Sequence, residues 1–303
     1  MAIGLNVGQS IISKEGQWYR CIQHLGTGGN AITYLVLSTS GLNSGSLFAL
    51  KIFQRVSDSE RLSKFHEEIA FLEKCDHPSI MRVYDSGEYS AGSQKHPFVV
   101  MEYLPVQLHG VIRRDDLDIA AKISLATQLA SSLMYLDQLN PKIIHRDIKP
   151  QNIFIKGKTC VLGDFGLMKV CSSESLDKEI DREDMKSYIG MPFYYRTPDL
   201  VSYTKGEIDL TTSTDIFQLR LVLAELFTKR NPCRVPKNKL DPVELDEIGT
   251  VPGELGGLIC SAIFTMLKME PEKRPTTKEL LDKWNGIFQI AVEKAHALNG
   301  KAL

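Results

Sequence analysis

The sequence lacks the features that would place it in a membrane, a secretory route or a nucleic-acid complex. No uncharged apolar run approaches the ~18 residues of a transmembrane helix, and the segment 219–227 is interrupted by Arg220 and Glu225. The first residues show neither a basic segment before an apolar core nor a glycine at position 2, so we expect no leader and no myristoyl anchor. The formal net charge is only -1, which indicates no field for nucleic acid. We therefore expect a cytoplasmic protein without a transmembrane segment that binds no nucleic acid.

Cysteine is sparse and unpatterned. The six residues include no Cys-x-x-Cys pair and no adjacent histidine cluster, so reduced, mostly buried thiols are expected. Internal repeats and low-complexity segments are also missing. With 303 residues, 43% hydrophobic and 24% charged, the chain has a globular composition and enough length for about two cores at ~150 residues per domain.

The chemistry of the chain is concentrated between residues 144 and 166. This stretch reads IHRDIKPQNIFI, then a short turn, then VLGDFG. Two carboxylates, Asp147 and Asp164, and one carboxamide, Asn152, thereby stand on neighbouring loops that flank a short apolar hairpin. Oxygen ligands of this kind can hold a divalent metal and phosphate beside a hydroxyl nucleophile.

The stretch resembles the catalytic loop and the metal-binding loop of the eukaryotic-type Ser/Thr protein kinase family, H-R-D-x-K-x-x-N followed by D-F-G. A lone Asp-Phe-Gly would be ordinary turn chemistry, whereas both motifs in this order are specific. The resemblance covers roughly residues 19–288 and implies an α+β bilobal fold with ATP in the cleft between the lobes. Its expected parts are a lead-in over 1–18, a mainly β N-lobe with one helix over 19–103, a mainly α C-lobe over 104–290 with a hinge at about 102–105, and a tail over 291–303.

The resemblance also implies roles for the residues of the two loops. Asp147 would orient a substrate hydroxyl and accept its proton, while Asn152 and Asp164 would coordinate Mg²⁺. Lys149 resembles the lysine of the Ser/Thr-directed branch, although an isolated loop lysine is usually a solvated cation. Arg146 stands where the family commonly receives a phosphate from the activation segment.

A glycine-containing turn lies between strands expected over 19–25 and 32–37. Glycine turns join many hairpins, so this turn alone is weak evidence. Compared with the family's G-x-G-x-x-G-x-V loop, two glycines match, an alanine replaces the third and a threonine replaces the valine. The resemblance implies that ATP contacts Gly26, Thr27, Gly28, Gly29, Asn30, Ala31 and Thr33.

Lys51 lies inside an apolar strand expected over 47–53. A lysine there is costly unless it faces an open side or meets phosphate and carboxylate. It matches the family's V-A-I-K lysine, and the strand expected over 96–103 ends like the family's hinge. The implied adenine contacts are Ala49, the gatekeeper Met101, the Glu102 carbonyl, the Leu104 amide and Phe154.

An amphipathic helix expected over 58–74 offers two acidic partners for Lys51, Glu67 and Glu68. The family has a His-Pro turn after this helix, and counting back from His77 selects Glu68. A long core-facing helix is expected over 117–139, and further helices over 215–227, 255–269 and 277–297.

The segment between the metal loop and Thr197 carries the candidates for regulation. Ser187 lies nearest to the family's usual distance for a phosphorylated residue, and we hypothesise that its phosphate binds Arg146. The acidic residues of the segment offer an alternative, because they could favour a basic substrate or substitute for phosphate. A charge-rich loop is, however, usually only solvated.

The later motifs are structural and include departures from the family. Asp215 matches the buried aspartate at a helix start, although a plain N-cap would explain it equally. Arg274 is expected to pair with Asp199, the acid of the A-P-E motif. Residues that depart from the family pattern put the substrate-side surface in doubt, and they are Met191 or Pro192, Gln218 and Arg220.

The sequence therefore predicts an ATP- and Mg²⁺-dependent protein kinase acting on Ser/Thr hydroxyls of a protein substrate. Three alternatives stay open: a catalytically silent nucleotide-binding scaffold, a small-molecule kinase of related fold, and a module that uses the same shell for protein contacts. The scaffold would be expected to lose Lys51, Asp147 or Asp164, and all three are present. Oligomeric state is not indicated by the sequence.

Overall fold

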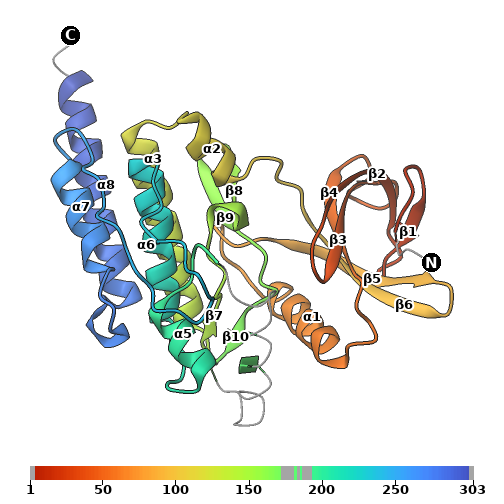
Figure 1. Ribbon diagram of the computed structural model, residues 1–303. Helices are drawn as coiled ribbons and strands as arrows, with labels where there is room; N and C mark the ends of the chain where they lie inside the picture. Colours follow the sequence, from red (N-terminus) through yellow and green to blue (C-terminus); the bar gives the residue numbers. More distant parts are fainter. Residues whose placement is uncertain (1–3, 172–180, 183–184, 186–192, 300–303) are drawn as a thin grey trace. The chain divides into compact units, whose positions relative to one another are not determined.

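The structure is a computed structural model of the 303-residue chain that describes residues 4–171, 181–182, 185 and 193–299. The chain divides into two compact units (Figure 1). The first comprises residues 1–76 and 80–105, and the second comprises 77–79 and 106–303. The first is built on a sheet and the second is mainly helical, so the expected α+β class is confirmed.

The first unit is one antiparallel sheet with a helix beside it (Figure 1). The strand order is β1-β2-β3-β4-β6-β5. The strands are β1 (Ser10–Ile12), β2 (Trp18–Thr27), β3 (Ala31–Ser38), β4 (Leu47–Phe53), β5 (Val83–Ala91) and β6 (Gln94–Glu102). Helix α1 (Ser59–Leu72) begins after Asp58, whose side chain accepts a hydrogen bond from the Arg61 N–H, the usual N-cap arrangement.

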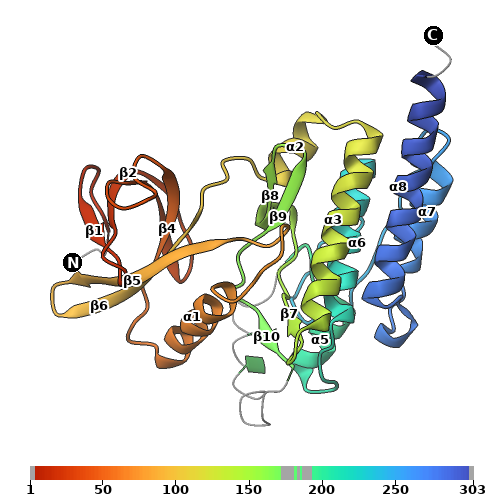
Figure 2. The same cartoon turned by 180° about the vertical axis from the view of Figure 1, so that it is seen from behind.

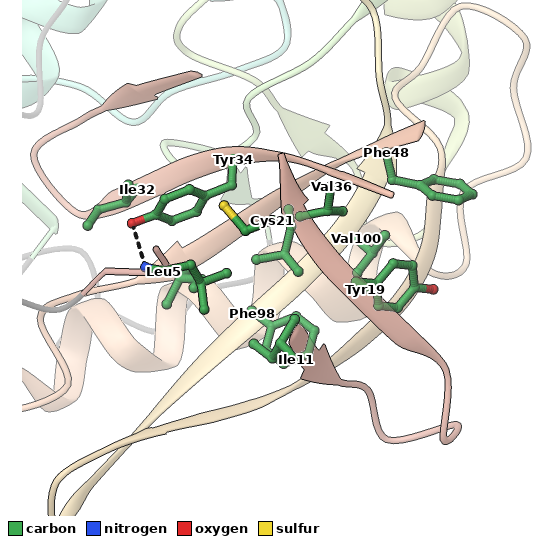
Figure 3. Close-up of a cluster of buried hydrophobic side chains, with 12 residues drawn as sticks. Leu5, Ile11, Tyr19, Cys21, Ile32, Tyr34, Val36, Phe48, Phe98 and Val100 are labelled. Carbon is green, nitrogen blue, oxygen red and sulfur yellow. Dashed lines mark hydrogen bonds between the residues drawn. The ribbon is translucent and has the colours of Figure 1, made fainter. Parts of the chain in front are cut away.

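Alternation along the strands builds two separate cores on the two faces of the sheet. On β4, Leu50 and Ile52 join a cluster on one face, shown in Figure 3, where the Leu5 N–H donates to the Tyr34 hydroxyl at 3.1 Å. On the other face, Phe53 packs with Phe65 of α1. Lys51 and Ala49 share the parity of Phe53, so the sheet turns them toward the α1 face.

Residues 4–18 are more ordered than the lead-in expected over 1–18. Ile11 and Leu5 are buried at 5% and 7% exposure, and β1 pairs with β2 through Ile11 opposite Tyr19. The three residues of β1 are too few to show the two-residue period of a strand, so the sequence did not predict this strand.

The second unit packs long helices side by side, as the two opposite views show (Figures 1 and 2). Helix α3 lies between α6 and α8, and α7 lies against α8. The helices are α2 (Leu108–Arg114), α3 (Ile119–Gln138), α5 (Pro198–Lys205), α6 (Ser213–Thr228), α7 (Gly256–Thr265) and α8 (Thr277–Asn299), with 3-10 turns η1 (Pro150–Asn152) and η2 (Pro271–Lys273). The four long helices were expected within a few residues, while the short α2 and α5 were not.

Two small antiparallel sheets in the second unit carry the chemistry. One pairs β7 (Ile143–Ile144) with β10 (Lys169–Val170), and the other is the hairpin of β8 (Ile153–Lys156) and β9 (Thr159–Leu162). All six cysteines are free thiols, three of them buried and Cys171 exposed. Within the described ranges, no helix has the length and apolarity needed to cross a membrane.

Candidate active site

The loop after β7 is held in an uncommon backbone conformation by a buried carboxylate. Arg146 has φ 66°, a left-handed conformation that costs free energy for any residue other than glycine. The Asp215 carboxylate accepts hydrogen bonds from the N–H groups of His145 at 2.8 Å and Arg146 at 2.9 Å. The N-cap of α6 is Thr212, so Asp215 holds this loop and does not act as a plain helix cap.

Gln218 secures the same loop from the next turn of α6 and was not expected to do so. Its Oε1 accepts from the Ile148 N–H at 2.9 Å, and its Nε2 donates to the carbonyls of Arg146 at 2.7 Å and Tyr195 at 3.0 Å. Asp147 therefore has a Gln218 hydrogen bond on each side of it in the chain. The sequence placed Gln218 with the substrate-side departures, whereas its side chain is buried against the catalytic loop.

Replacing Gln218 with Met should remove these bonds while keeping the volume of the side chain. Three buried backbone groups would lose a partner, at about 1–3 kcal/mol each, and Asp147 would be held less firmly. We expect a lower urea midpoint and a lower kcat. The matched control is Gln128→Met, because Gln128 accepts from the Cys160 N–H on β9, away from this loop. Gln128→Met should lose stability and keep its kcat. Equal kcat values in Gln218→Met and Gln128→Met would contradict a role of Gln218 in holding Asp147.

Asp147 lies at the centre of a short hydrogen-bond network. Lys149 Nζ is 2.7 Å and 3.0 Å from its two carboxylate oxygens, and Asn152 Nδ2 donates to Oδ2 at 2.8 Å and to the Asp147 carbonyl at 2.9 Å. Burial raises the pKa of Asp147 to about 6, with Lys149 opposing the rise and Asp164 adding to it. The carboxylate is thus ionised at neutral pH and more basic than an exposed aspartate, which suits a proton acceptor.

The two side chains expected to bind metal stand on loops that are joined by a hydrogen bond. Because Nδ2 of Asn152 is engaged by Asp147, its Oδ1 is left as a ligand atom, and no described residue donates a hydrogen bond to it. Asp164 is exposed and follows β9 with φ 59°, and the Gly163 N–H donates to the Asn152 carbonyl at 2.8 Å. One carboxylate and one amide oxygen on linked loops fit the hard-oxygen preference of Mg²⁺.

His145 joins the catalytic loop to the metal loop as a neutral ring. It is fully buried, its Nε2 is 3.2 Å from the Gly163 carbonyl, and its Nδ1 is 3.3 Å from the Asp147 nitrogen. These partners assign the hydrogen to Nε2 and leave Nδ1 as the acceptor. The ring centroid lies 4.4 Å from that of Phe165.

Protonation of His145 should therefore destabilise the fold. Burial lowers its pKa from 6.5 to about 4, so between these values the unfolded chain binds more protons than the folded one. The free energy of unfolding should fall as the pH is lowered through this window. Urea unfolding of the wild type and of His145→Gln at several pH values measures it: the variant should lack this part of the pH dependence. Identical pH profiles would contradict it.

In the first unit, Lys51 and Glu68 form the expected ion pair. Their Nζ and Oε1 atoms are 2.9 Å apart, and the side chains are 16% and 4% exposed. Glu67 is exposed and accepts from Ser63 Oγ at 3.3 Å, so the choice of Glu68 is confirmed. The buried Glu68 carboxylate orients the Lys51 ammonium group. The ammonium group is itself partly exposed and so is accessible to a phosphate.

At the glycine turn between β2 and β3, no described side chain packs against the Gly26 and Gly28 Cα atoms on the side where a Cβ would point. Neither Gly26 nor Gly28 has a positive φ, and a Cβ at Gly26 would meet nothing within 4 Å, while at Gly28 it would meet only the Ala31 carbonyl at 3.7 Å. Neither packing within the described residues nor backbone conformation therefore requires glycine at these two positions. The absence of side chains instead suits a loop whose backbone approaches a ligand closely. The tip is fixed by Arg55 Nε, which donates to the Gly29 carbonyl at 2.7 Å, and by Arg61, which bonds Asn30 at 3.2 Å.

Three of the expected nucleotide positions, Thr33, Ala49 and Met101, share the face of the sheet that carries Lys51. Thr33 is directly opposite Lys51, and Ala49 is directly opposite Met101. The Glu102 N–H donates to the Arg82 carbonyl, and Leu104 follows in the connecting chain. Phe154 lies on β8 in the second unit and forms an isolated β-bridge with Gln107. Their nucleotide contacts stay predictions.

The guanidinium of Arg146 faces an acid that sequence reasoning did not single out. Its Nη1 is 2.6 Å from Asp181 Oδ2. Ser187, the phosphorylation candidate, lies outside the described residues, as do Met191 and Pro192. The only available signal for Asp181 was its place among the acids of the segment.

The structural pair expected near the end of the chain is confirmed. Arg274 forms a two-pronged ion pair with Asp199, at 2.9 Å and 3.1 Å, and both side chains are buried. Arg220 is fully buried as well, with its guanidinium 5.8 Å from the Phe217 ring centroid. Burial lowers the pKa of Arg220 to about 9. Arg220 therefore belongs to the interior and not to the substrate-side surface suggested by the sequence.

Comparison with known proteins agrees with this arrangement. The Caenorhabditis elegans serine/threonine-protein kinase WNK is 27% identical over 284 residues, covering 89% of this chain and 14% of that protein. The Myxococcus xanthus serine/threonine-protein kinase pkn2 is 26% identical over 280 residues, covering 87% and 32%. The Arabidopsis thaliana serine/threonine-protein kinase CTR1 is 27% identical over 265 residues, covering 82% and 30%. The chain thus spans less than a third of the length of these relatives.

A family model described as the protein kinase domain matches residues 19–284. This range contains every residue of the two loops and of the Lys51–Glu68 pair. The match extends over most of the chain, from β2 into α8. The chain belongs to the protein kinase family.

Proposed function

We propose that this protein transfers the γ-phosphoryl group of ATP, in the presence of Mg²⁺, to Ser/Thr hydroxyls of a protein substrate. The observation that carries the proposal is the network around Asp147. Its buried carboxylate is ionised, is bonded to Lys149 and Asn152, and is joined through that asparagine to the loop of Asp164. Such a constellation is suited to a hydroxyl nucleophile beside a metal-bound phosphate.

In the proposed reaction the substrate oxygen forms a bond to the γ-phosphorus while the bond to the bridging oxygen of ADP breaks. Asp147 accepts the hydroxyl proton, and Lys149 offsets negative charge on the transferred group. Lys51, oriented by Glu68, would hold the α- and β-phosphates of ATP, and backbone N–H groups of the glycine turn would add hydrogen bonds to the phosphates. Mg²⁺, held by Asn152 and Asp164, would neutralise phosphate charge.

Two observations support Ser/Thr as the acceptor. Lys149 stands two residues after Asp147 and contacts its carboxylate, and the three relatives named above are serine/threonine-protein kinases by name. Phosphorylation of Ser187 is the regulation suggested by the sequence, and cytoplasmic residence likewise stays a prediction. These relatives are much longer than this chain, which covers 14%, 32% and 30% of their lengths.

Incubation with γ-labelled ATP, Mg²⁺ and a generic basic protein tests the proposal, with Asp147→Ala as the control. We expect label on the protein substrate that disappears in the control. Nucleotide binding without transfer would favour a silent scaffold. Label found only on a metabolite would favour a small-molecule kinase, and either result would contradict the proposal.

A further inference from the structure

A buried ionic cluster lies behind the catalytic loop, with Asp181 at its centre. Asp181 Oδ2 is 2.6 Å from Arg146 Nη1, 3.3 Å from Lys169 Nζ, and accepts a hydrogen bond from the Tyr203 hydroxyl at 2.7 Å. The Arg146, Lys169 and Asp181 side chains are only 3%, 8% and 8% exposed. Three donors from the loop before Asp147, from β10 and from α5 therefore converge on one carboxylate oxygen.

The cluster links the parts that must act together. Besides Asp181, the Arg146 guanidinium donates to the carbonyls of Leu167 and Met168, which follow the metal loop directly. The backbone of Arg146 is in turn fixed by Asp215 and Gln218. The Arg146 side chain thus connects the catalytic loop to the residues just after the metal loop and to Asp181.

Two cations in such a buried place require an anion. Burial by itself would raise the pKa of Asp181, but the charges of Arg146 and Lys169 and the Tyr203 hydroxyl hold it well below its usual range. The carboxylate is therefore ionised under ordinary conditions. Removing one member of a buried pair leaves an uncompensated charge, so Arg146 and Lys169 would repel each other without Asp181.

We propose that Asp181 is the resident anion of the Arg146 site and positions the catalytic loop, so that activity does not require a phosphate on the activation segment. This inference rests on the proposed kinase function. A carboxylate bonded to an arginine, a lysine and a hydroxyl offers what a phosphate would offer there, with less charge. It selects one of the alternatives left open by the sequence, in which acids of this segment substitute for a phosphate at Ser187.

The test begins with wild-type protein treated with phosphatase and verified as phosphate-free by mass spectrometry. Single-turnover transfer from γ-labelled ATP to a basic protein is measured before the enzyme itself gains label. We expect full activity in this sample and in Ser187→Ala. Activity that appears only after the segment is phosphorylated would overturn the inference, whereas no transfer in either state would overturn the proposed function itself.

Variants of Asp181 give the second measurement. Loss of position can cost roughly 10²-fold in rate, so Asp181→Asn should lower kcat by about that factor without changing the KM for ATP. Asp181→Glu should regain most of the rate, because it restores the charge. The matched control is Asp246→Asn, since Asp246 makes an exposed ion pair with Arg234 and should be neutral.

The readouts distinguish positioning from simple stability. Asp181→Asn with wild-type kcat, or Asp181→Glu no better than Asp181→Asn, would contradict the inference. Circular dichroism checks that each variant is folded. Where Asp181→Asn does not fold, the phosphate-free wild type still decides: active protein supports the resident anion, and inactive protein refutes it.

Discussion

Asp147→Asn should lower kcat by about 10²–10⁴-fold, the usual contribution of a positioned general base. Asparagine has the same shape and its oxygen can still accept the Asn152 hydrogen bond, but an amide cannot take the proton of the acceptor hydroxyl. The residue is not part of the nucleotide grip, so the affinity for ATP should change little. Steady-state kinetics with a basic protein substrate and a nucleotide-binding titration measure the two effects separately.

The control for this change is Asp116→Asn. Asp116 is about half exposed and pairs with Arg114 on the surface of the second unit, so the substitution removes a carboxylate without touching the active site. It should leave both kcat and nucleotide affinity unchanged. If Asp147→Asn retained the wild-type kcat, Asp147 would not be the proton acceptor and the assignment of this loop would be wrong.

Arg274→Met should lower the free energy of unfolding by about 3–5 kcal/mol, because it leaves Asp199 charged, buried and without its cation. All five N–H donors of Arg274 are used: two meet the Asp199 carboxylate, and the others meet the carbonyls of Lys268, Met269 and Ser213. Urea unfolding monitored by circular dichroism measures the loss.

A surface ion pair provides the comparison for Arg274. Lys278 pairs with Asp282 on α8, and the two side chains are 73% and 60% exposed. Exposed pairs contribute little to stability, so Lys278→Met should unfold at nearly the wild-type urea concentration. If Arg274→Met and Lys278→Met were equally stable, loss of the buried Arg274–Asp199 pair would cost no more than loss of an exposed pair, and the prediction would be wrong.

Motif spacing predicted the charged core of the site because those residues act through short, local geometry. The pairs Asp147–Asn152 and Lys149–Asp147 lie five and two residues apart in the chain, so the order of the residues already limits their separation. The Lys51–Glu68 pair joins a strand to a helix 17 residues away. Helix periodicity left Glu67 and Glu68 open, and the resemblance of the turn at His77 to the family's His-Pro turn selected Glu68. The long helices were found through the same helix periodicity.

Some residues whose partners are distant in the sequence were missed or misread. Gln218 bonds the catalytic loop 70 and 72 residues earlier, and Asp181 bonds Arg146 35 residues earlier. Neither contact leaves a periodic or spacing signal, and only the folded chain shows which acid of a charge-rich segment is buried. Arg220 was assigned to the substrate-side surface only because it departs from the family pattern, and arginine is rarely buried in proteins. The short strand β1 likewise depends on pairing with β2.

Phosphoamino-acid analysis of a protein substrate after one turnover with γ-labelled ATP and Mg²⁺ tests the proposed Ser/Thr phosphoryl transfer. Wild-type protein and Asp147→Asn are compared at equal concentration, with a chelator as a further control. We expect label on serine or threonine from the wild type alone, and only when the metal is present. Label on tyrosine, transfer that survives in Asp147→Asn, or hydrolysis of ATP with no labelled protein would contradict it.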